Sequence, residues 1–145
     1  MTAQLMETLY YKGEKFGMAT EPLKEYLQTR SDIKFMPRIE SWCWRQYVGE
    51  WEIKNGKLYL IELHGMLAGP KKFTVDSLFP GRKTAFAHWF SGEIRVPQGE
   101  MIEYVHLGYE SIYERDLFLA FEKGLLIGEH VMDNKGKRSI WNSKK

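Results

Sequence analysis

Asn55-Gly56 is the feature that most constrains the fold, because it lies between two stretches in which apolar and polar residues alternate. Asn-Gly is the preferred pair for a two-residue type I′ turn, since both of its positions need positive φ. A turn at this pair fixes the register of a hairpin and places Trp51 opposite Leu60 and Ile53 opposite Leu58. We therefore expect these four side chains to form an apolar patch on one face of the hairpin.

A second hairpin is predicted around Pro97-Gln98-Gly99, because Pro presets φ for a turn and Gly accepts positive φ. The runs 86–96 and 101–107 on either side are rich in β-branched and aromatic residues, as strands are. Gly92 inside the first run indicates a bulge or a bend. A turn here would lay the two runs side by side as an antiparallel pair.

A third hairpin and an N-terminal strand complete the strand signals. The apolar runs 117–121 and 125–132 are separated by Glu122-Lys123-Gly124, which predicts a turn between two strands. Residues 5–11 predict a further strand, followed by a turn at Lys12-Gly13-Glu14.

One short helix is predicted over 22–27, because Pro22 suits the first helical position. Residues 64–72 and 76–84 are rich in Gly, Pro and Lys and are predicted to be loops. No linker marks a second domain. The pattern predicts a mainly β fold, an antiparallel barrel-like or sandwich sheet built from hairpins, with one short N-terminal helix.

The composition agrees with one folded domain. The chain has 145 residues, of which 43% are hydrophobic and 14% aromatic, whereas disordered chains are poor in aromatics. We expect a single β domain over 1–134 and a basic C-terminal tail over 135–145. The formal net charge of +2 is small for a general nucleic-acid binder, which usually has a large basic excess on one face.

The sequence also indicates a compartment. Cys43 is the single cysteine, so no disulfide can form within the chain. The N-terminal residues contain no long apolar run of the kind found in a signal peptide. No stretch approaches 18 consecutive apolar residues, so no membrane-spanning helix is expected. We expect a cytoplasmic protein that does not bind membranes.

The densest group of polar and aromatic residues lies between positions 103 and 116, and the predicted turn at Pro97-Gln98-Gly99 would bring Glu93 and Arg95 beside it. We expect a polar binding surface there, formed by Arg95, Tyr104, His106, Tyr109 and Tyr113. This predicts a non-enzymatic binding or interaction domain for a small polar ligand or a protein partner. Self-association through an edge strand is an open alternative. An outward polar face without a ligand is another.

Catalysis is a second hypothesis, in which His106 acts with Glu93 or Glu103 as a hydrolase or isomerase. No catalytic residue can be assigned from a motif. The four histidines, which include His64 and His88, have no metal-ligand spacing, so we expect no metal and no cofactor. A third hypothesis is binding of single-stranded nucleic acid, for which tryptophans and a basic tail are suited.

That third hypothesis uses Trp42 and Trp44, which would share one face of a strand. Core packing is the alternative use for such large side chains. The segment 41–47, the run 89–99 and the tyrosine-rich run 104–114 also resemble a family of small bacterial proteins of uncharacterised activity. The resemblance covers roughly residues 41–134. It implies a bacterial cytoplasmic protein, and it implies no catalytic residues.

Overall fold

The computed structural model describes residues 5–36, 45–105, 109 and 111–135, and in this part the protein is mainly β. Two single-turn helices interrupt the strands. In chain order the elements are β1 (Glu7–Tyr11), β2 (Glu14–Met18), α1 (Lys24–Leu27), β3 (Tyr47–Lys54), β4 (Lys57–Leu67), β5 (Lys71–Lys72), α2 (Val75–Leu78), β6 (Ala85–Phe86), β7 (Gly92–Glu103), β8 (Ile112–Glu122) and β9 (Leu125–Asp133).

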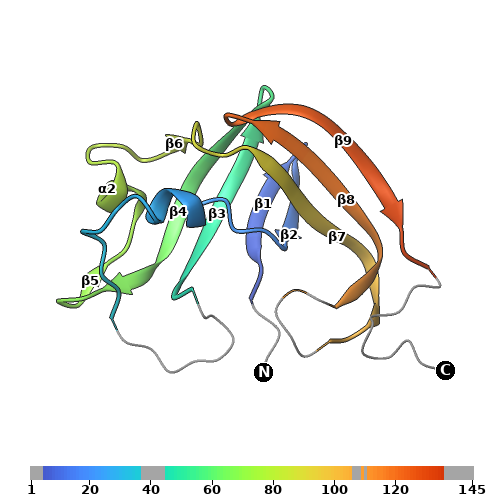
Figure 1. Ribbon diagram of the computed structural model, residues 1–145, viewed down its shortest axis with the longest axis horizontal. Coiled ribbons are helices and arrows are strands. Elements are labelled where there is room, and N and C mark those ends of the chain that lie inside the picture. The colour runs from blue at the N-terminus through green and yellow to red at the C-terminus, as the bar shows by residue number, and fades with distance from the viewer. Residues whose placement is uncertain (1–4, 37–44, 106–108, 110, 136–145) are drawn as a thin grey trace.

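The strands form one nine-stranded sheet with the order β2-β1-β3-β4-β9-β8-β7, and β5 and β6 pair with β4. An antiparallel sheet was expected from the sequence. The β1–β3 pair is parallel, however, so the sheet is mixed. Figure 1 shows β3 and β4 on one side, β7 to β9 on the other, and β1 and β2 between them. The sheet is not closed, and neither a barrel nor a sandwich is confirmed.

The three tightest hairpins have the turn chemistry that the sequence predicts. Their turn pairs all have positive φ at both residues: Lys12-Gly13 at 52° and 78°, Asn55-Gly56 at 53° and 74°, and Lys123-Gly124 at 49° and 82°. This is the type I′ conformation, which matches the twist of the flanking strands. The register of the Asn55-Gly56 hairpin is confirmed, because Trp51 pairs with Leu60 and Ile53 with Leu58.

The predicted turn at Pro97-Gln98-Gly99 is wrong. These residues lie inside β7, which pairs with β8 along Gly92–Glu103 and is disturbed by register shifts after Gln98. β7 ends the strand order, and an edge strand tolerates a Pro that cannot donate a hydrogen bond. Gly99 has a positive φ of 82°, which glycine adopts without strain, and an added Cβ there would also clash with Glu114 of β8. Pro97 and Gly99 therefore lie in an irregular part of an edge strand and do not reverse the direction of the chain.

The short helix predicted at 22–27 is confirmed as α1 over Lys24–Leu27. The loop predicted at 76–84 begins instead within α2, where the side chains of Thr74 and Ser77 cap the backbone N–H groups reciprocally. The loop predicted at 64–72 is partly strand, because β4 continues to Leu67 and Lys71–Lys72 pairs back onto it. No helix in the described residues has the length and apolar character needed to cross a membrane.

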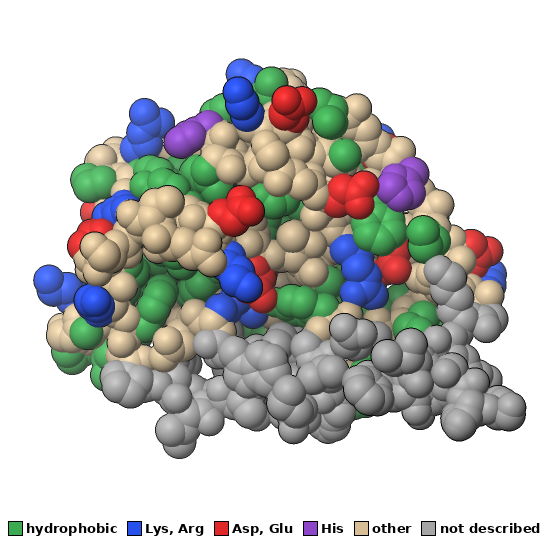
Figure 2. Space-filling model, in the orientation of Figure 1, with side chains coloured by type: hydrophobic (Ala, Val, Ile, Leu, Met, Phe, Trp, Pro, Cys, Tyr) green, Lys and Arg blue, Asp and Glu red, His purple; other side chains and the backbone are tan. Residues whose placement is uncertain are grey.

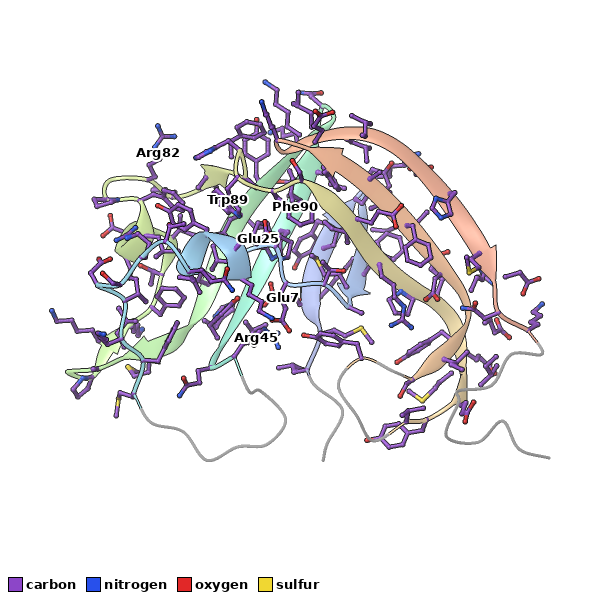
Figure 3. The ribbon with its side chains drawn as sticks, viewed as in Figure 1. Glu7, Glu25, Arg45, Arg82, Trp89 and Phe90 are labelled. Carbon is purple, nitrogen blue, oxygen red and sulfur yellow. The ribbon has the colours of Figure 1, made fainter. Side chains whose placement is uncertain are left out.

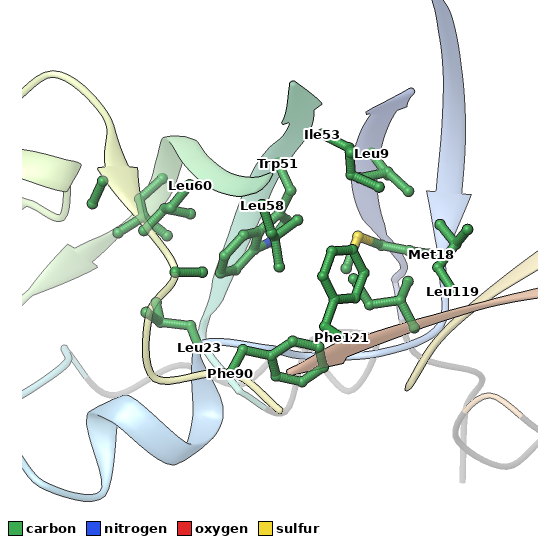
Figure 4. Packing of buried hydrophobic residues seen from close by; sticks show 14 of the residues in the cluster. Leu9, Met18, Leu23, Trp51, Ile53, Leu58, Leu60, Phe90, Leu119 and Phe121 are labelled. Atoms are coloured by element: carbon green, nitrogen blue, oxygen red, sulfur yellow. The ribbon is translucent and has the colours of Figure 1, made fainter. Parts of the chain in front are cut away.

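The core lies on the inner face of the sheet. Trp51, Leu58 and Leu60 are fully buried and Ile53 is 9% exposed, so the predicted apolar face of the first hairpin is confirmed. Leu119 of β8 is also fully buried. Figure 4 shows these side chains from both sides of the molecule meeting in one cluster. Burial of large apolar side chains contributes about 1.5–3 kcal/mol each, so this cluster is a main source of stability.

Gly124 and Gly56 offer a matched test of turn docking. Both are the second residue of a type I′ turn. An added Cβ at Gly124 would lie 2.6 Å from the Ala87 carbonyl oxygen, whereas an added Cβ at Gly56 would have no atom within 4 Å. We expect Gly56→Ala to lower the free energy of unfolding by about 1–2 kcal/mol through the positive φ alone. Gly124→Ala should cost about 2–5 kcal/mol, because overpacking is added. Equal losses in urea unfolding would contradict this docking.

Candidate ligand-binding site

Arg95 is used for structure in the observed fold. Its guanidinium donates to Asp116 Oδ1 at 2.9 Å, to the Tyr109 carbonyl at 2.6 Å and to the Ser111 carbonyl at 3.0 Å. Asn134 completes the group by donating to Asp116 Oδ2 at 2.8 Å. These bonds fasten the connection between β7 and β8 to the sheet. Arg95 is therefore a clamp for that connection in this arrangement.

The other residues of the predicted polar surface are placed differently. Tyr104 lies just beyond β7 and is 51% exposed, and Tyr113 lies in β8 opposite Met101. His106 lies outside the described residues. Tyr109 points elsewhere, because its hydroxyl donates to Glu21 Oε2 at 2.7 Å. Of the five predicted residues, Arg95 and Tyr109 are hydrogen-bonded to each other, and Tyr109 takes part through its backbone carbonyl.

The predicted catalytic carboxylates lie near opposite ends of one strand. Glu93 and Glu103 are ten residues apart in β7, which corresponds to roughly 30 Å in an extended strand. Glu93 was expected near Tyr104 and His106 because of the predicted turn at 97–99, and these residues lie instead inside β7. The nucleic-acid hypothesis depended on Trp42, Trp44 and the basic tail. These tryptophans and residues 136–145 lie outside the described residues.

A pocket of about 480 Å³ lies between the segment that includes α1 and the start of β3. Small-molecule sites in proteins have volumes of about 300–1,000 Å³ and combine apolar walls with a few polar groups. Figure 2 shows hydrophobic side chains in hollows on this face, with charged side chains beside them. The pocket is lined by Glu21, Lys24, Leu27, Gln28, Phe35, Arg45 and Tyr47.

Arg45 in the pocket wall is held by a buried carboxylate. Glu7 is 1% exposed, and its Oε2 accepts hydrogen bonds from Arg45 Nε at 2.9 Å and from the Gly49 N–H at 3.0 Å. Its Oε1 accepts one from Trp51 Nε1 at 2.7 Å. Figure 3 shows Glu7 and Arg45 close together, from β1 and from the segment that enters β3. Burial raises the pKa of Glu7, and Arg45 and the other donors oppose this by stabilising the carboxylate.

The local sequence explains how Glu7 enters the interior. Leu9 pairs with Trp51 in the parallel β1–β3 ladder, and Glu7 lies two residues earlier on the same face. Gly49 leaves room for it, because a Cβ there would lie 2.8 Å from Glu7 Oε1 and 2.9 Å from Trp51 Nε1. The Glu7 carboxylate thus occupies the space that a side chain at position 49 would need.

Two tyrosines lie close to this ion pair. Tyr47 is 4% exposed and stacks on Phe35 with ring centroids 5.9 Å apart. Burial raises the pKa of Tyr47, and burial together with the hydrogen bond to Glu21 raises the pKa of Tyr109. Both phenols are therefore neutral at ordinary pH. They offer hydroxyl groups that donate or accept hydrogen bonds near Arg45.

The helical wall is positioned by contacts to distant elements. Trp89 Nε1 donates to the Pro22 carbonyl at 2.8 Å, and Leu23 is fully buried. The Tyr26 ring lies 4.8 Å from Trp89 and 5.1 Å from Phe79. A single-turn helix has little stability of its own, so these contacts fix its place.

The facing wall is anchored to β4. Phe35 forms a β-bridge with Leu67, and the Met36 N–H donates to the Met66 carbonyl at 3.0 Å. Gln46 Nε2 donates to the Met36 carbonyl at 2.9 Å. The aromatic wall is therefore tied both to the sheet and to the strand entry that holds Arg45.

A second group of polar side chains lies on the outer face of β3 and β4. Ligand atoms of Glu50, Glu62 and His64 lie within 4.8 Å of one another, and within the described residues this group has the composition to hold a metal ion. From the sequence we expected no metal. The sequence did not reveal this group because its residues come from two strands. His64 Nε2 lies 2.8 Å from Glu50 Oε2, which is an ordinary cross-strand interaction.

No protein-family model matches the chain, and no curated protein and no solved structure shows a significant match to it. The resemblance of residues 41–134 to small bacterial proteins therefore stays a resemblance, and it assigns no activity. A function must therefore be inferred from the pocket and the groups around it.

The sequence reading missed Glu7, Glu21, Arg45 and Tyr47. One signal was present, because Glu7 is in phase with Leu9 and Tyr11 on a predicted strand and is the charged residue on that face. Its partner Arg45 is 38 positions away, and no local pattern connects them.

Removing Glu7 should destabilise the protein strongly. Glu7→Ala leaves the Arg45 guanidinium buried without its carboxylate, and losing one partner of a buried ion pair costs about 3–5 kcal/mol. The exposed Glu14→Ala in β2 is the control, with a change within about 0.5 kcal/mol. Urea unfolding followed by tryptophan fluorescence measures both. A small loss for Glu7→Ala would show that the ion pair is dispensable.

A tyrosine with a raised pKa should make the fold sensitive to alkali. Burial and the hydrogen bond to Glu129 raise the pKa of Tyr11 from its ordinary value of 10.0 to about 12. A raised pKa contributes stability below pH 10 that is lost as the pH rises toward 12. We expect the free energy of unfolding to fall over this range, and to fall less in Tyr11→Phe. Identical losses in the two proteins would contradict the assignment.

Proposed function

We propose that this protein is a small-molecule binding protein whose ligand occupies the pocket between α1 and the start of β3. The pocket volume and the buried Arg45–Glu7 pair in its wall support this proposal most directly. A buried ion pair is often no more stabilising than apolar residues of the same size. Its presence beside a pocket is therefore better explained by recognition of a ligand than by stability.

The walls support binding of an amphipathic molecule. Leu27, Phe35 and the Tyr47 ring provide apolar contact area, while Lys24 and Gln28 provide hydrogen-bond donors. The pocket is supported from behind by the core, since Tyr47 and Phe73 are both nearly fully buried. A supported site loses less conformational entropy when a ligand binds.

We also propose that the sheet is barrel-like. The Ala19 N–H donates to the Arg95 carbonyl at 2.8 Å, and the Arg95 N–H donates to Thr20 Oγ1 at 2.9 Å. These bonds bring the segment after β2 against β7, the other end of the strand order. The pocket would then lie at one mouth of the curved sheet, a common position for ligand sites in such folds.

A cytoplasmic location is part of the same proposal. The sequence offers Cys43 as its single cysteine, and secreted domains of modest size more often depend on disulfides. The ion-paired and hydrogen-bonded core described above needs no covalent bridge. Fractionation of the producing cell, with detection by an antibody, would test the location.

Filling the pocket should weaken binding of a neutral aromatic probe. We expect N-phenyl-1-naphthylamine to bind with saturation, and Gln28→Trp, which puts an indole into the pocket wall, to weaken binding at least about tenfold. Glu25→Trp is the matched control, because Glu25 is equally exposed in α1 and does not line the pocket. Fluorescence titration measures all three proteins. No saturable binding, or equal binding in both variants, would refute the proposed site.

A further inference from the structure

We propose that Glu50, Glu62 and His64 bind a divalent transition-metal ion of the zinc type. The three side chains lie on the outer face of β3 and β4. None of them lines the pocket between α1 and the start of β3. The metal site is therefore a second site, and it does not depend on the function proposed for that pocket.

A bulge in β4 brings these side chains to one face. Leu60 lies opposite Trp51, and Glu62 lies opposite Glu50, so β4 has one residue more than β3 between these two pairs. In a regular strand Glu62 would point inward with Leu60, because residues two apart share a face. With the extra residue, Glu62 is exposed like His64 while Leu60 is buried. Bulges often redirect a side chain in this way beside functional sites.

The three ligand atoms have spacings that one ion can bridge. His64 Nε2 lies 2.8 Å from Glu50 Oε2 and 3.8 Å from Glu62 Oε1. Bonds of about 2.0–2.2 Å at tetrahedral angles place neighbouring ligands of one zinc ion about 3.3–3.6 Å apart. The observed distances lie on both sides of this range. More than half of the His64 and Glu62 side chains is exposed, so small rotations suffice to bring all three atoms to one ion.

The pairing of Glu50 with Glu62 is electrostatically unfavourable. The two residues are directly opposite in the β3–β4 ladder, where like charges destabilise a sheet. In the part of the chain that the structure describes, neither carboxylate forms an ion pair with a Lys or Arg, and the contact of each is with His64. A neutral imidazole does not compensate two negative charges. A bound divalent cation would neutralise both carboxylates.

Glu50 gives the site a fixed side. It lies in β3 between β1 and β4, and its side chain is 24% exposed. The Tyr10 hydroxyl donates a long hydrogen bond of 3.5 Å to Glu50 Oε1, the oxygen that does not contact His64. Such outer partners orient the carboxylates that bind metals. A site with one fixed ligand and two adjustable ones loses little order when an ion binds.

The kind of ligand determines the kind of ion. Mg²⁺ and Ca²⁺ prefer oxygen ligands, whereas a set of one imidazole and two carboxylates suits Zn²⁺ and similar ions. Three protein ligands leave at least one position for water, as in catalytic zinc sites. Glu62 and His64 also line a pocket of about 600 Å³ on this face, so an ion there would be open to water and small molecules.

Calorimetric titration with zinc chloride tests the site. We expect the full chain to bind one Zn²⁺ with saturation, and an excess of Mg²⁺ not to displace it. Glu50→Gln, Glu62→Gln and His64→Gln should each weaken binding at least about tenfold, because each removes a ligand. Glu52→Gln is the matched control, since Glu52 shares a face of β3 with Glu50 but lies opposite Tyr59. His130→Gln in β9 controls for histidines outside the group.

Thermal unfolding distinguishes a ligand from a merely structural residue. In EDTA, Glu62→Gln should unfold at the same or a higher temperature than the natural sequence, because it removes the repulsion from Glu50. With free Zn²⁺ about tenfold above Kd, the natural sequence should gain about 3–6 °C and Glu62→Gln should gain little. The order of the two proteins therefore reverses when the metal is added.

The outcomes separate this proposal from the proposed function. If Zn²⁺ does not bind with saturation, or if Glu50→Gln, Glu62→Gln and His64→Gln all bind it as the natural sequence does, the metal site is wrong. Equal affinity for Mg²⁺ would overturn the assignment to the zinc type. Binding of N-phenyl-1-naphthylamine should be unchanged in His64→Gln, because His64 does not line the pocket beside α1. Loss of probe binding there would show that the two sites are not separate.

Discussion

The carboxylate of Glu7 is the group on which the inner face of this protein depends. It carries charge into a region where an unpaired carboxylate would be very costly, so it must be surrounded by donors. Those donors come from β3, through Gly49 and Trp51, and from the residue that leads into β3, Arg45. The side-chain interactions therefore fix β1 beside β3, which is a parallel pair, and they also fix Trp51, the largest buried side chain among the described residues.

The same interaction connects stability to the pocket. Arg45 belongs both to the buried ion pair and to the pocket wall, and Tyr47 belongs both to the core and to that wall. A ligand in this pocket would contact a wall already fixed by the fold, so little ordering would accompany binding. The arrangement also means that a ligand would stabilise the native state in proportion to its free concentration over its Kd.

Local chemistry was predictable from sequence, and non-local pairing was not. Asn55-Gly56 and Lys123-Gly124 are turns because their residues tolerate positive φ wherever they stand. Pro97-Gln98-Gly99 has similar chemistry but serves an edge strand, and only the partner strand β8 distinguishes the two uses. That one error moved the expected site, because it placed 93–96 beside 104–106. The candidate pocket escaped prediction for the same reason: Glu7 and Arg45 meet through a parallel pair that no turn signals.

The wall that α1 forms shows how such a site can be built on very little regular structure. α1 is one turn long and has no fully buried residue of its own, yet Pro22 and Leu23 just before it are buried and Arg30 just after it donates to the Leu78 carbonyl at 3.0 Å. The segment is thus held at both ends while its middle faces the pocket. Because the anchors are separate from Lys24 and Gln28, these two residues of the pocket lining can be substituted without loss of the wall. The specificity of the pocket and the stability of its wall are therefore determined by different side chains.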